Sequence, residues 1–297
     1  MKNSIKHSLI ATAALLLLAG CDPKDPIYNT LHPEHGAVTL TTDWSNIGEG
    51  LTAPDSYTVK AADYSATLSG NVNLLDHLFD PATLRINVYN TAEHVSINGS
   101  TATVATVATA TGNVDGAGLF IQDTPGWLFT SVTDAVIEAD KDHALTAVMQ
   151  QQVRELTLII EPTGGSTDRI ERIEGYLTGA AASLNFADGT HATPSNVEVQ
   201  FAQITSGTNA GKYAATVRLL GTAGPQQKLY AQIRFSGGSP ATINLDSDLS
   251  AELATFNADK RTPLTLGGSV VETPTEAGFT ATITDWKPVD GGDVSAD

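Results

Sequence analysis

Apolar and polar residues alternate with a period of two along much of the chain from Ala37 onward. In the first run, Ala37–Trp44, Val38 and Leu40 fall on one side and Thr39 and Thr41 on the other. Later runs are Tyr57–Ala61, Leu84–Tyr89, Tyr213–Leu219, Leu229–Phe235 and Phe279–Thr284. Such alternation is typical of strands with one face on a core and the other in water. We therefore expect an all-β protein built from antiparallel β-sandwiches.

Turn-forming residues separate the runs and leave little room for helices. The turn signals are Asn98-Gly99, Gly164-Gly165, Asp188-Gly189, Asn209-Ala210-Gly211 and Gly237-Gly238. Two segments, Asn73–Leu78 and Asp248–Asn257, have a pattern that predicts a short helical turn. Neither is long enough for an independent amphipathic helix.

The first 20 residues have the features of a secretory signal peptide. Lys2 and Lys6 precede a short apolar run, Leu9–Leu18, which is too short to cross a bilayer as a helix. The following Leu18-Ala19-Gly20-Cys21 resembles the bacterial lipobox. That resemblance implies cleavage between Gly20 and Cys21 and acylation of Cys21, with palmitate among the attached chains. The implied product is a membrane-tethered lipoprotein.

Cys21 is the only cysteine in the chain. The alternative to lipidation is an ordinary signal peptide followed by an unpaired thiol, which would be open to oxidation and cross-linking in an exported protein. Since no second thiol exists, no intramolecular disulfide can form and apolar cores must provide the stability. About 276 residues follow Cys21, enough for one domain and typical of two.

The charge balance is strongly acidic, with 16 Lys plus Arg against 33 Asp plus Glu and a formal net charge of −17. Such a surface repels nucleic acid and anionic headgroups, so we do not expect the protein to bind nucleic acid. Hydrophobic residues make up 41% of the chain and charged residues only 16%, a composition that folds.

Residues 21–36 are expected to form an extended tether, since Pro23, Pro26 and Pro33 interrupt a stretch with little apolar periodicity. Charged residues, Asp22 and Asp25 among them, directly follow Cys21. Surface-displayed lipoproteins of the Bacteroidetes resemble this arrangement, which implies a lipid-anchored location at the outer membrane, displayed on the cell surface. The alternative is that these acidic residues are simply solvated.

The sequence contains no recognisable catalytic motif. It lacks Gly-x-Ser-x-Gly, His-Glu-x-x-His, a phosphate-binding glycine loop and a cysteine nucleophile, so we expect no enzyme, catalytic residue or cofactor. Asp188-Gly189-Thr190-His191 is interpreted as a hairpin turn. Weak metal-site candidates are His32-Pro33-Glu34-His35, Asp246/Asp248 and Asp290/Asp293, each interpreted as solvated. Trp44, Trp127 and Trp286 are expected to pack in or beside the core.

Several segments together resemble a known family. They are Leu31–Trp44, Ser56–Lys60, Asp80–Asn90, Ala92–Ser100, Met149–Ile160 and Ile173–Ala180. They are similar to fimbrillin-type lipoproteins of the Bacteroidales, and most to the FimB/Mfa2 fimbrial-anchor group. Because Met149–Ile160 resembles the opening strand of that family's second domain, the boundary is placed near Asp142.

The resemblance implies two tandem β-sandwich domains of transthyretin-like topology, residues 37–141 and 142–290, followed by a tail at 291–297. It also implies a fimbrial anchor or minor fimbrial subunit that acts in cell adhesion. Its partners would be other fimbrial subunits, joined by exchange of β-strands. The alternative function is a surface glycan-binding lipoprotein, which should present two or more aromatic side chains together on one exposed face.

The distribution of basic residues helps to separate an anchor from a stalk subunit. Stalk fimbrillins of this family are typically cut after an arginine or lysine near the first strand, and anchors keep that strand. Here the first arginine is Arg85, and Lys60 is the only other basic residue between Lys24 and Arg85. A protease with that specificity would find no site directly after the first strand, which favours an uncut subunit.

The last alternating segment, Gly278–Trp286, is the candidate donor strand, with Phe279, Ala281 and Ile283 as its inserted side chains. The resemblance implies that the C-terminal strand region is what one subunit donates to the next. The competing interpretation is that these residues complete the core of their own domain.

Overall fold

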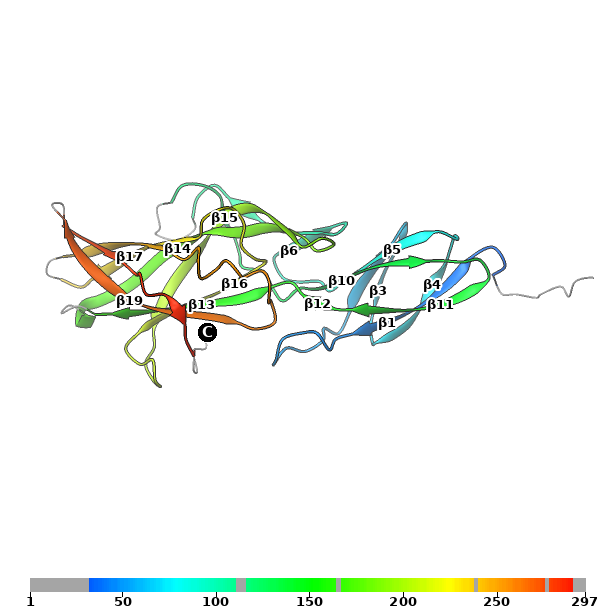
Figure 1. The fold of residues 1–297 in the computed structure, drawn as a ribbon, viewed down its shortest axis with the longest axis horizontal. Coiled ribbons are helices and arrows are strands. Elements are labelled where there is room, and N and C mark those ends of the chain that lie inside the picture. The colour runs from blue at the N-terminus through cyan, green and yellow to red at the C-terminus, as the bar shows by residue number, and fades with distance from the viewer. Residues whose placement is uncertain (1–31, 111–115, 164–166, 238–239, 276–277, 291–297) are drawn as a thin grey trace, which may run out of the picture.

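The computed structural model describes residues 32–110, 116–163, 167–237, 240–275 and 278–290, and it is an all-β structure. The molecule is elongated and consists of two lobes joined end to end (Figure 1). The described part of the chain contains one short 3-10 helix, η1 (Thr167–Arg169), and otherwise strands and turns.

Two sheets enclose the core of the first lobe. One has the order β11 (Lys141–Val148), β1 (Gly36–Asp43) and β4 (Val72–Phe79). The other has the order β12 (Gln150–Gln151), β10 (Phe129–Val136), β5 (Thr83–Tyr89), β2 (Tyr57–Ala61) and β3 (Tyr64–Leu68). Both sheets contribute to one cluster of buried side chains, including Val38, Leu40, Val59 and Ile86.

The second lobe is built on one large sheet. Its order is β6 (Val95–Asn98), β7 (Thr101–Val104), β14 (Ile170–Asn185), β17 (Lys228–Phe235), β18 (Thr242–Asp248), β20 (Gly278–Thr282), β19 (Leu264–Thr275), β13 (Arg154–Pro162), β16 (Tyr213–Leu219), β15 (Thr190–Gln203), β9 (Phe120–Ile121) and β8 (Thr106–Val107). The short β21 (Lys287–Pro288) pairs with β19. Because β14 also pairs with β15, the strands from β14 through β20 to β15 close into a ring.

The alternating pattern accounts for the strands that form this ring. In β17 every second residue, Leu229, Ala231, Ile233 and Phe235, is buried, and the residues between them are partly exposed. β13 differs because most of its residues, including Leu158 and Ile159, are buried, so both of its faces are covered.

The chain passes between the lobes more than once. Ala92 and Leu128 belong to the second core although the strands before and after them, β5 and β10, belong to the first. Met149 is buried in the first core and Val153 in the second. Trp127 packs against both cores at the junction.

Both segments expected to be helical differ in the structure. Asn73–Leu78 lies inside β4, where Leu75 is buried and Leu74 is 69% exposed. Six residues cannot offset the cost of helix nucleation, whereas the extended backbone pairs with β1 at Asn73, Leu74 and Leu78, on both sides of a register shift. Asp248–Asn257 forms successive turns, in which only Leu253 N–H bonds the carbonyl four residues earlier, at 2.9 Å from Leu249 O.

The turn predictions fare better within the described residues. Gly99, Gly189 and Gly211 each have a positive φ, of 59°, 75° and 88°, and each lies between paired strands. Gly164-Gly165 and Gly238 lie outside the described residues.

Candidate functional site

The predicted lipid-attachment residue Cys21, the cleavage position Gly20 and the rest of the signal segment lie outside the described residues. The last part of the predicted tether is described and is not extended. His32 Nδ1 bonds the carbonyl of His35, and His32 Nε2 lies 3.0 Å from Asp142 Oδ1. The bond to Asp142 raises the pKa of His32. These contacts fix the entry to β1 at the end of the first lobe (Figure 1).

β1 occupies the centre of its three-stranded sheet. It pairs with β11 in parallel from Gly36↔Lys141 to Asp43↔Val148, and with β4 in antiparallel orientation. Val38 is 0% exposed and Leu40 is 1% exposed, so the strand also fills the core below it. Without β1, the backbone groups of β11 and β4 facing it would lose their partners and the core would open as a groove.

The first two basic residues that follow β1 in the sequence, Lys60 and Arg85, both lie inside paired strands. Lys60 is in β2, which pairs with β3 and β5, and its Nζ lies 6.0 Å from the centre of the Tyr89 ring. Arg85 is in β5, and its Nε donates to Asp134 Oδ1 on β10 at 2.8 Å. Neither residue offers the accessible, extended loop that proteolysis requires.

The candidate donor strand lies within its own ring in this structure. β20 pairs in parallel with β18 through Leu245↔Ala281 and in antiparallel orientation with β19. Ala281 and Ile283 are buried, at 4% and 2% exposed. Phe279 is placed opposite Pro274 by the backbone register. The strand thus completes the second lobe's sheet here, and its donation to another subunit stays a prediction.

A serine joins this strand region to the rest of the core. Ser247 Oγ donates to the Ile283 carbonyl at 2.6 Å and accepts from Trp286 Nε1 at 2.8 Å. Trp286 is buried, as expected for a core tryptophan. Trp44 packs against Tyr57 and Phe129, at ring-centre distances of 6.3 and 5.9 Å.

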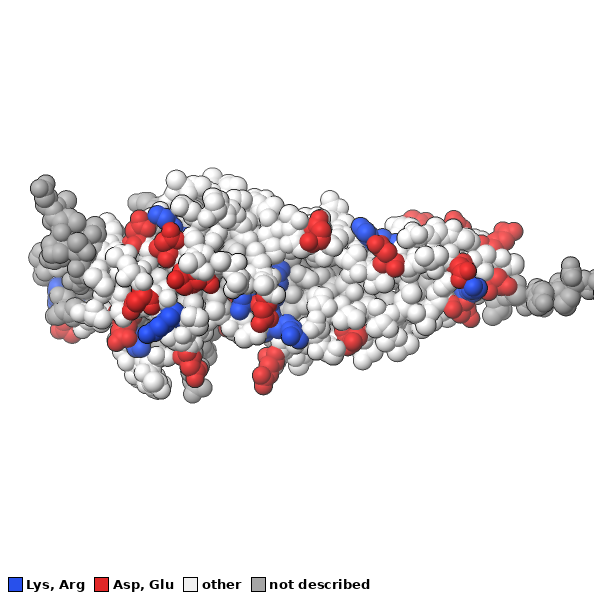
Figure 2. Space-filling model, in the orientation of Figure 1, with Lys and Arg blue, Asp and Glu red and all other residues white. Residues whose placement is uncertain are grey.

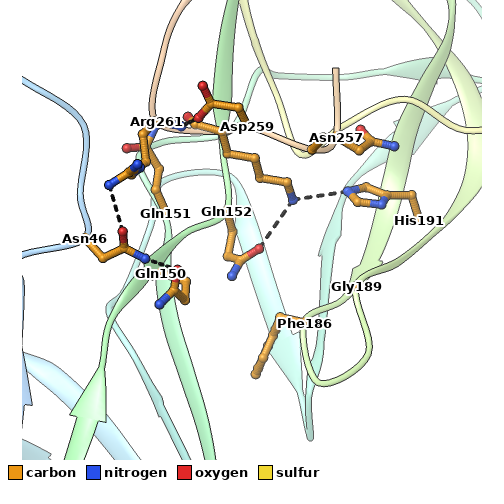
Figure 3. A pocket seen from close by; sticks show the side chains of 12 residues that line it. Asn46, Gln150, Gln151, Gln152, Phe186, Gly189, His191, Asn257, Asp259 and Arg261 are labelled. Carbon is orange, nitrogen blue, oxygen red and sulfur yellow. Dashed lines mark hydrogen bonds between the residues drawn. The ribbon is translucent and has the colours of Figure 1, made fainter. Parts of the chain in front are cut away.

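A cavity of about 550 Å³ lies where the two lobes meet. Its lining comes from the loop after β1, from β12 and the residue after it, from the β14–β15 hairpin and from residues 257–261: Asn46, Gln150, Gln151, Gln152, Phe186, Gly189, His191, Asn257, Ala258, Asp259, Lys260 and Arg261. We call this the junction pocket. Gln152 and His191 point toward one another across it (Figure 3).

Lys260 makes the central contacts of the junction pocket. Its Nζ lies 3.1 Å from His191 Nε2, and it donates to Leu220 O at 3.1 Å and to Gln152 Oε1 at 3.3 Å. Burial lowers the pKa of Lys260 to about 8. Burial, and then the nearby Lys260, lower the pKa of His191 to about 4. At neutral pH the imidazole is therefore neutral. Its Nε2 also lies 3.2 Å from Leu220 O, and in the tautomer protonated at Nδ1 it accepts a hydrogen bond from the ammonium.

Gln151 ties the two lobes together beside this pocket. Its Oε1 accepts from the Gly48 N–H at 2.9 Å, and its Nε2 donates to Lys260 O at 2.5 Å and to Val153 O at 2.8 Å. Arg261 Nη1 donates to Asn46 Oδ1 at 2.8 Å. Polar contacts thus hold the two lobes together at the junction.

Charged side chains elsewhere stand singly or in small mixed groups. On the face in Figure 2 the acidic groups are spread over both lobes and no extended basic patch is visible. Within the described residues no group of three or more His, Cys, Asp or Glu side chains could hold a metal ion, and no helix there is long and apolar enough to span a membrane.

The family model of the fimbrillin-A associated anchor proteins Mfa1 and Mfa2 matches residues 86–291. The chain belongs to the Mfa2 family. The resemblance found in the sequence is thereby confirmed, and a function in fimbrial adhesion follows from the membership. No curated protein matches the chain.

Solved structures share the fold at low sequence identity. The fimbrial anchor protein Mfa2 from Porphyromonas gingivalis is 15% identical, with a TM-score of 0.54, and the match covers 86% of this chain and 97% of that one. A candidate adhesin from Bacteroides ovatus is 14% identical, with a TM-score of 0.56 and coverages of 83% and 92%. A candidate polysaccharide-binding protein from Bacteroides thetaiotaomicron is 9% identical, with a TM-score of 0.52 and coverages of 86% and 98%.

Sequence reasoning missed the junction pocket of this Mfa2-family protein. His191 was assigned to a hairpin turn, and it does follow that turn, but its ring also lines the pocket. The lining extends from Asn46 to Arg261 with no local motif to connect its members. A lysine and an arginine side by side in an acidic chain, Lys260-Arg261, were the available signal.

Proposed function

We propose that this Mfa2-family protein is a lipid-anchored fimbrial anchor or minor fimbrial subunit, held at the outer membrane through acyl chains on Cys21 and displayed on the cell surface. More than one acyl chain gives stable anchoring, because each buried methylene contributes about 0.8 kcal/mol. The fixed entry to β1 supports this arrangement, since the contact of His32 with Asp142 holds the end of the predicted tether against the first lobe.

The retained first strand is the observation that carries the anchor assignment. β1 is paired on both sides and its Val38 and Leu40 are buried, so the groove that a neighbouring subunit's strand could enter is already filled. The absence of Lys and Arg between Val38 and Tyr57 supports an uncut strand. A subunit with a filled groove ends the polymer on that side, as a basal anchor must.

We propose that the two lobes are tandem β-sandwich domains of transthyretin-like topology. The sequence-based division into residues 37–141 and 142–290 stays a prediction. The burial of Ala147 and Met149 in the first core favours a later change of lobe, near Val153. Ala92, Ala102 and Leu128 pack in the second core.

Strand exchange would use the other end of the chain. The β19–β20 hairpin lies at the end of the molecule opposite the entry to β1 (Figure 1). A strand from this end, with Phe279, Ala281 and Ile283 as inserted side chains, would enter the groove of the first stalk subunit. Main-chain hydrogen bonds and alternating side-chain pockets would supply the affinity.

The glycan-binding alternative required exposed aromatic side chains on one face. Tyr176 and Tyr230 lie side by side on β14 and β17, with ring centres 5.3 Å apart, but both are half-buried. Phe120 packs edge-on against Tyr176 at 5.4 Å, and Gly116 lies so close that a Cβ there would be 2.8 Å from the Tyr176 ring. This pair packs beneath a loop, which leaves the anchor function as the better supported one.

Purification of intact fimbriae from the cell surface tests the anchor function. The chain should co-purify in small amount, still lipidated, at one end of each fimbria. Immunogold labelling spread along the fimbrial shaft, or fimbriae retained on cells that lack the chain, would contradict it.

A further inference from the structure

The junction pocket holds positive charge that no carboxylate of the described residues neutralises. Among the described residues no Asp or Glu forms an ion pair with Lys260 or Arg261. The three acceptors of the Lys260 ammonium, His191, Gln152 and the Leu220 carbonyl, are all neutral. Asp259 also lines the pocket, but its carboxylate accepts from the Arg261 backbone N–H at 3.0 Å and bonds Thr262.

A partly buried cation without a counter-charge is costly in a folded protein. Here it occurs in a chain of net charge −17, where carboxylates are twice as frequent as basic side chains. A cleft between two lobes that carries such a group is a typical ligand-binding position. The arrangement therefore fits a ligand that itself brings the negative charge.

The rest of the lining fits a ligand with hydroxyl groups. The amides of Asn46 and Gln150, which bond each other, can donate to and accept from hydroxyls. The half-buried ring of Phe186 forms an apolar edge (Figure 3). The volume of about 550 Å³ lies within the usual range for small-molecule sites.

We propose that the junction pocket binds a carboxylate-bearing saccharide. The carboxylate lies toward Lys260 and Arg261, displacing His191 or Gln152 as an acceptor, and the sugar hydroxyls contact the amides. An extended acidic peptide fits less well, because strand addition needs a free edge and β12 is only two residues long. The proposal is independent of the anchor function, since β1 and β20 do not line the pocket.

Binding of D-galacturonate to the purified, lipidated chain in detergent micelles tests the proposal by isothermal titration. D-galactose, which lacks the carboxylate, and acetate, which lacks the ring, are the matched ligands. We expect saturable binding of galacturonate and at least about tenfold weaker binding of both controls. Absence of saturable galacturonate binding, equal binding of galactose or acetate, or tighter binding of a glutamate-rich hexapeptide would overturn the proposal.

Two variants locate the site. Lys260→Met should weaken galacturonate binding about tenfold or more, because it removes a charge-assisted hydrogen bond. Lys141→Met is the matched control, since Lys141 lies on β11 and pairs with Glu138 on the exposed surface. If Lys260→Met does not fold, Arg261→Gln replaces it, because Arg261 is exposed at the rim. Unchanged affinity in the folded variant would place the ligand elsewhere and overturn the assignment.

Discussion

Lys260 Nζ lies 3.1 Å from His191 Nε2, so a second proton on the imidazole would place two cations in contact at the junction of the lobes. Burial and this neighbour lower the pKa of His191 from 6.5 to about 4. The folded protein therefore keeps His191 neutral under conditions in which the unfolded chain protonates it. The stability of the folded protein is therefore linked to pH through the junction of the lobes.

The first prediction is a loss of stability in mild acid that depends on His191. Since the unfolded state binds the proton near pH 6.5 and the folded state only near pH 4, stability present above pH 6.5 falls as the pH drops toward 4. Allowing for solvent screening, the loss should be about 1 to 2 kcal/mol. His191→Gln should lose this component, as measured by urea unfolding of both proteins between pH 7 and pH 4.

Comparison of the two proteins isolates His191. His32, whose pKa is raised by Asp142, titrates in both and cancels in the difference. An identical pH dependence in wild type and His191→Gln would show that the imidazole is not held neutral by the junction.

The fold could be predicted from sequence where one periodic run suffices to assign both faces of a strand. Leu229 to Phe235 is such a run, because a period of two assigns inner and outer residues without knowledge of the partner strands. The segment around Leu74 and Leu78 was assigned wrongly, because four-residue spacing within six residues fits a helical turn as well. Only the pairing with β1 decides between them.

The lobes and the site could not be predicted fully, because both depend on pairing between strands that are far apart in the sequence. The packing of Ala102 into the second core depends on β7 pairing with β14, some eighty residues later, which no local pattern encodes. The junction pocket likewise joins Asn46 to Arg261. The role of Cys21 could be predicted from the sequence because a signal peptide is defined by consecutive residues.

The second prediction concerns the filled groove around β1. Leu40→Ala should lower the free energy of unfolding by about 2 to 5 kcal/mol, because Leu40 is 1% exposed and its loss leaves a cavity between the two sheets. Thr41→Ala, one residue along on the outer face, should change it by about 0.5 kcal/mol or less. Equal effects in urea unfolding would mean that β1 does not support the core.

The third prediction concerns the membrane tether. Cys21→Ser should move the protein from the membrane fraction to the soluble fraction without changing its circular dichroism, because Cys21 lies outside the predicted domains. Fractionation measures the change of location, and mass spectrometry of the N-terminal peptide measures the acylation of the wild type. A variant that stays in the membrane fraction, together with a wild-type peptide that carries no acyl chain, would refute the lipobox assignment.

The fourth prediction concerns the donor strand and uses a reversible lock. Val271 and Thr282 are paired across β19 and β20, and both side chains are on the outer face, opposite to the buried Ala281. Cysteines at these two positions can form a disulfide that holds β20 in its own ring. Because Cys21 is the only native cysteine and is predicted to be acylated, no other thiol competes.

If β20 must leave its ring to hold the first stalk subunit, cells carrying oxidised Val271→Cys/Thr282→Cys should shed their fimbriae into the medium, and a reductant should restore attachment. The matched control is Arg85→Cys/Asp134→Cys, which locks two outward-facing partners on β5 and β10 in the first lobe and should leave attachment unchanged. When β20 leaves the ring, the buried side chains of Ile283 and Trp286 become exposed, which costs about 1.5 to 3 kcal/mol for each such side chain. The acceptor groove must therefore bury an equivalent apolar surface. Full retention of fimbriae by the locked, folded protein would show that Ala281 and Ile283 serve only their own core, and that another surface holds the fimbria.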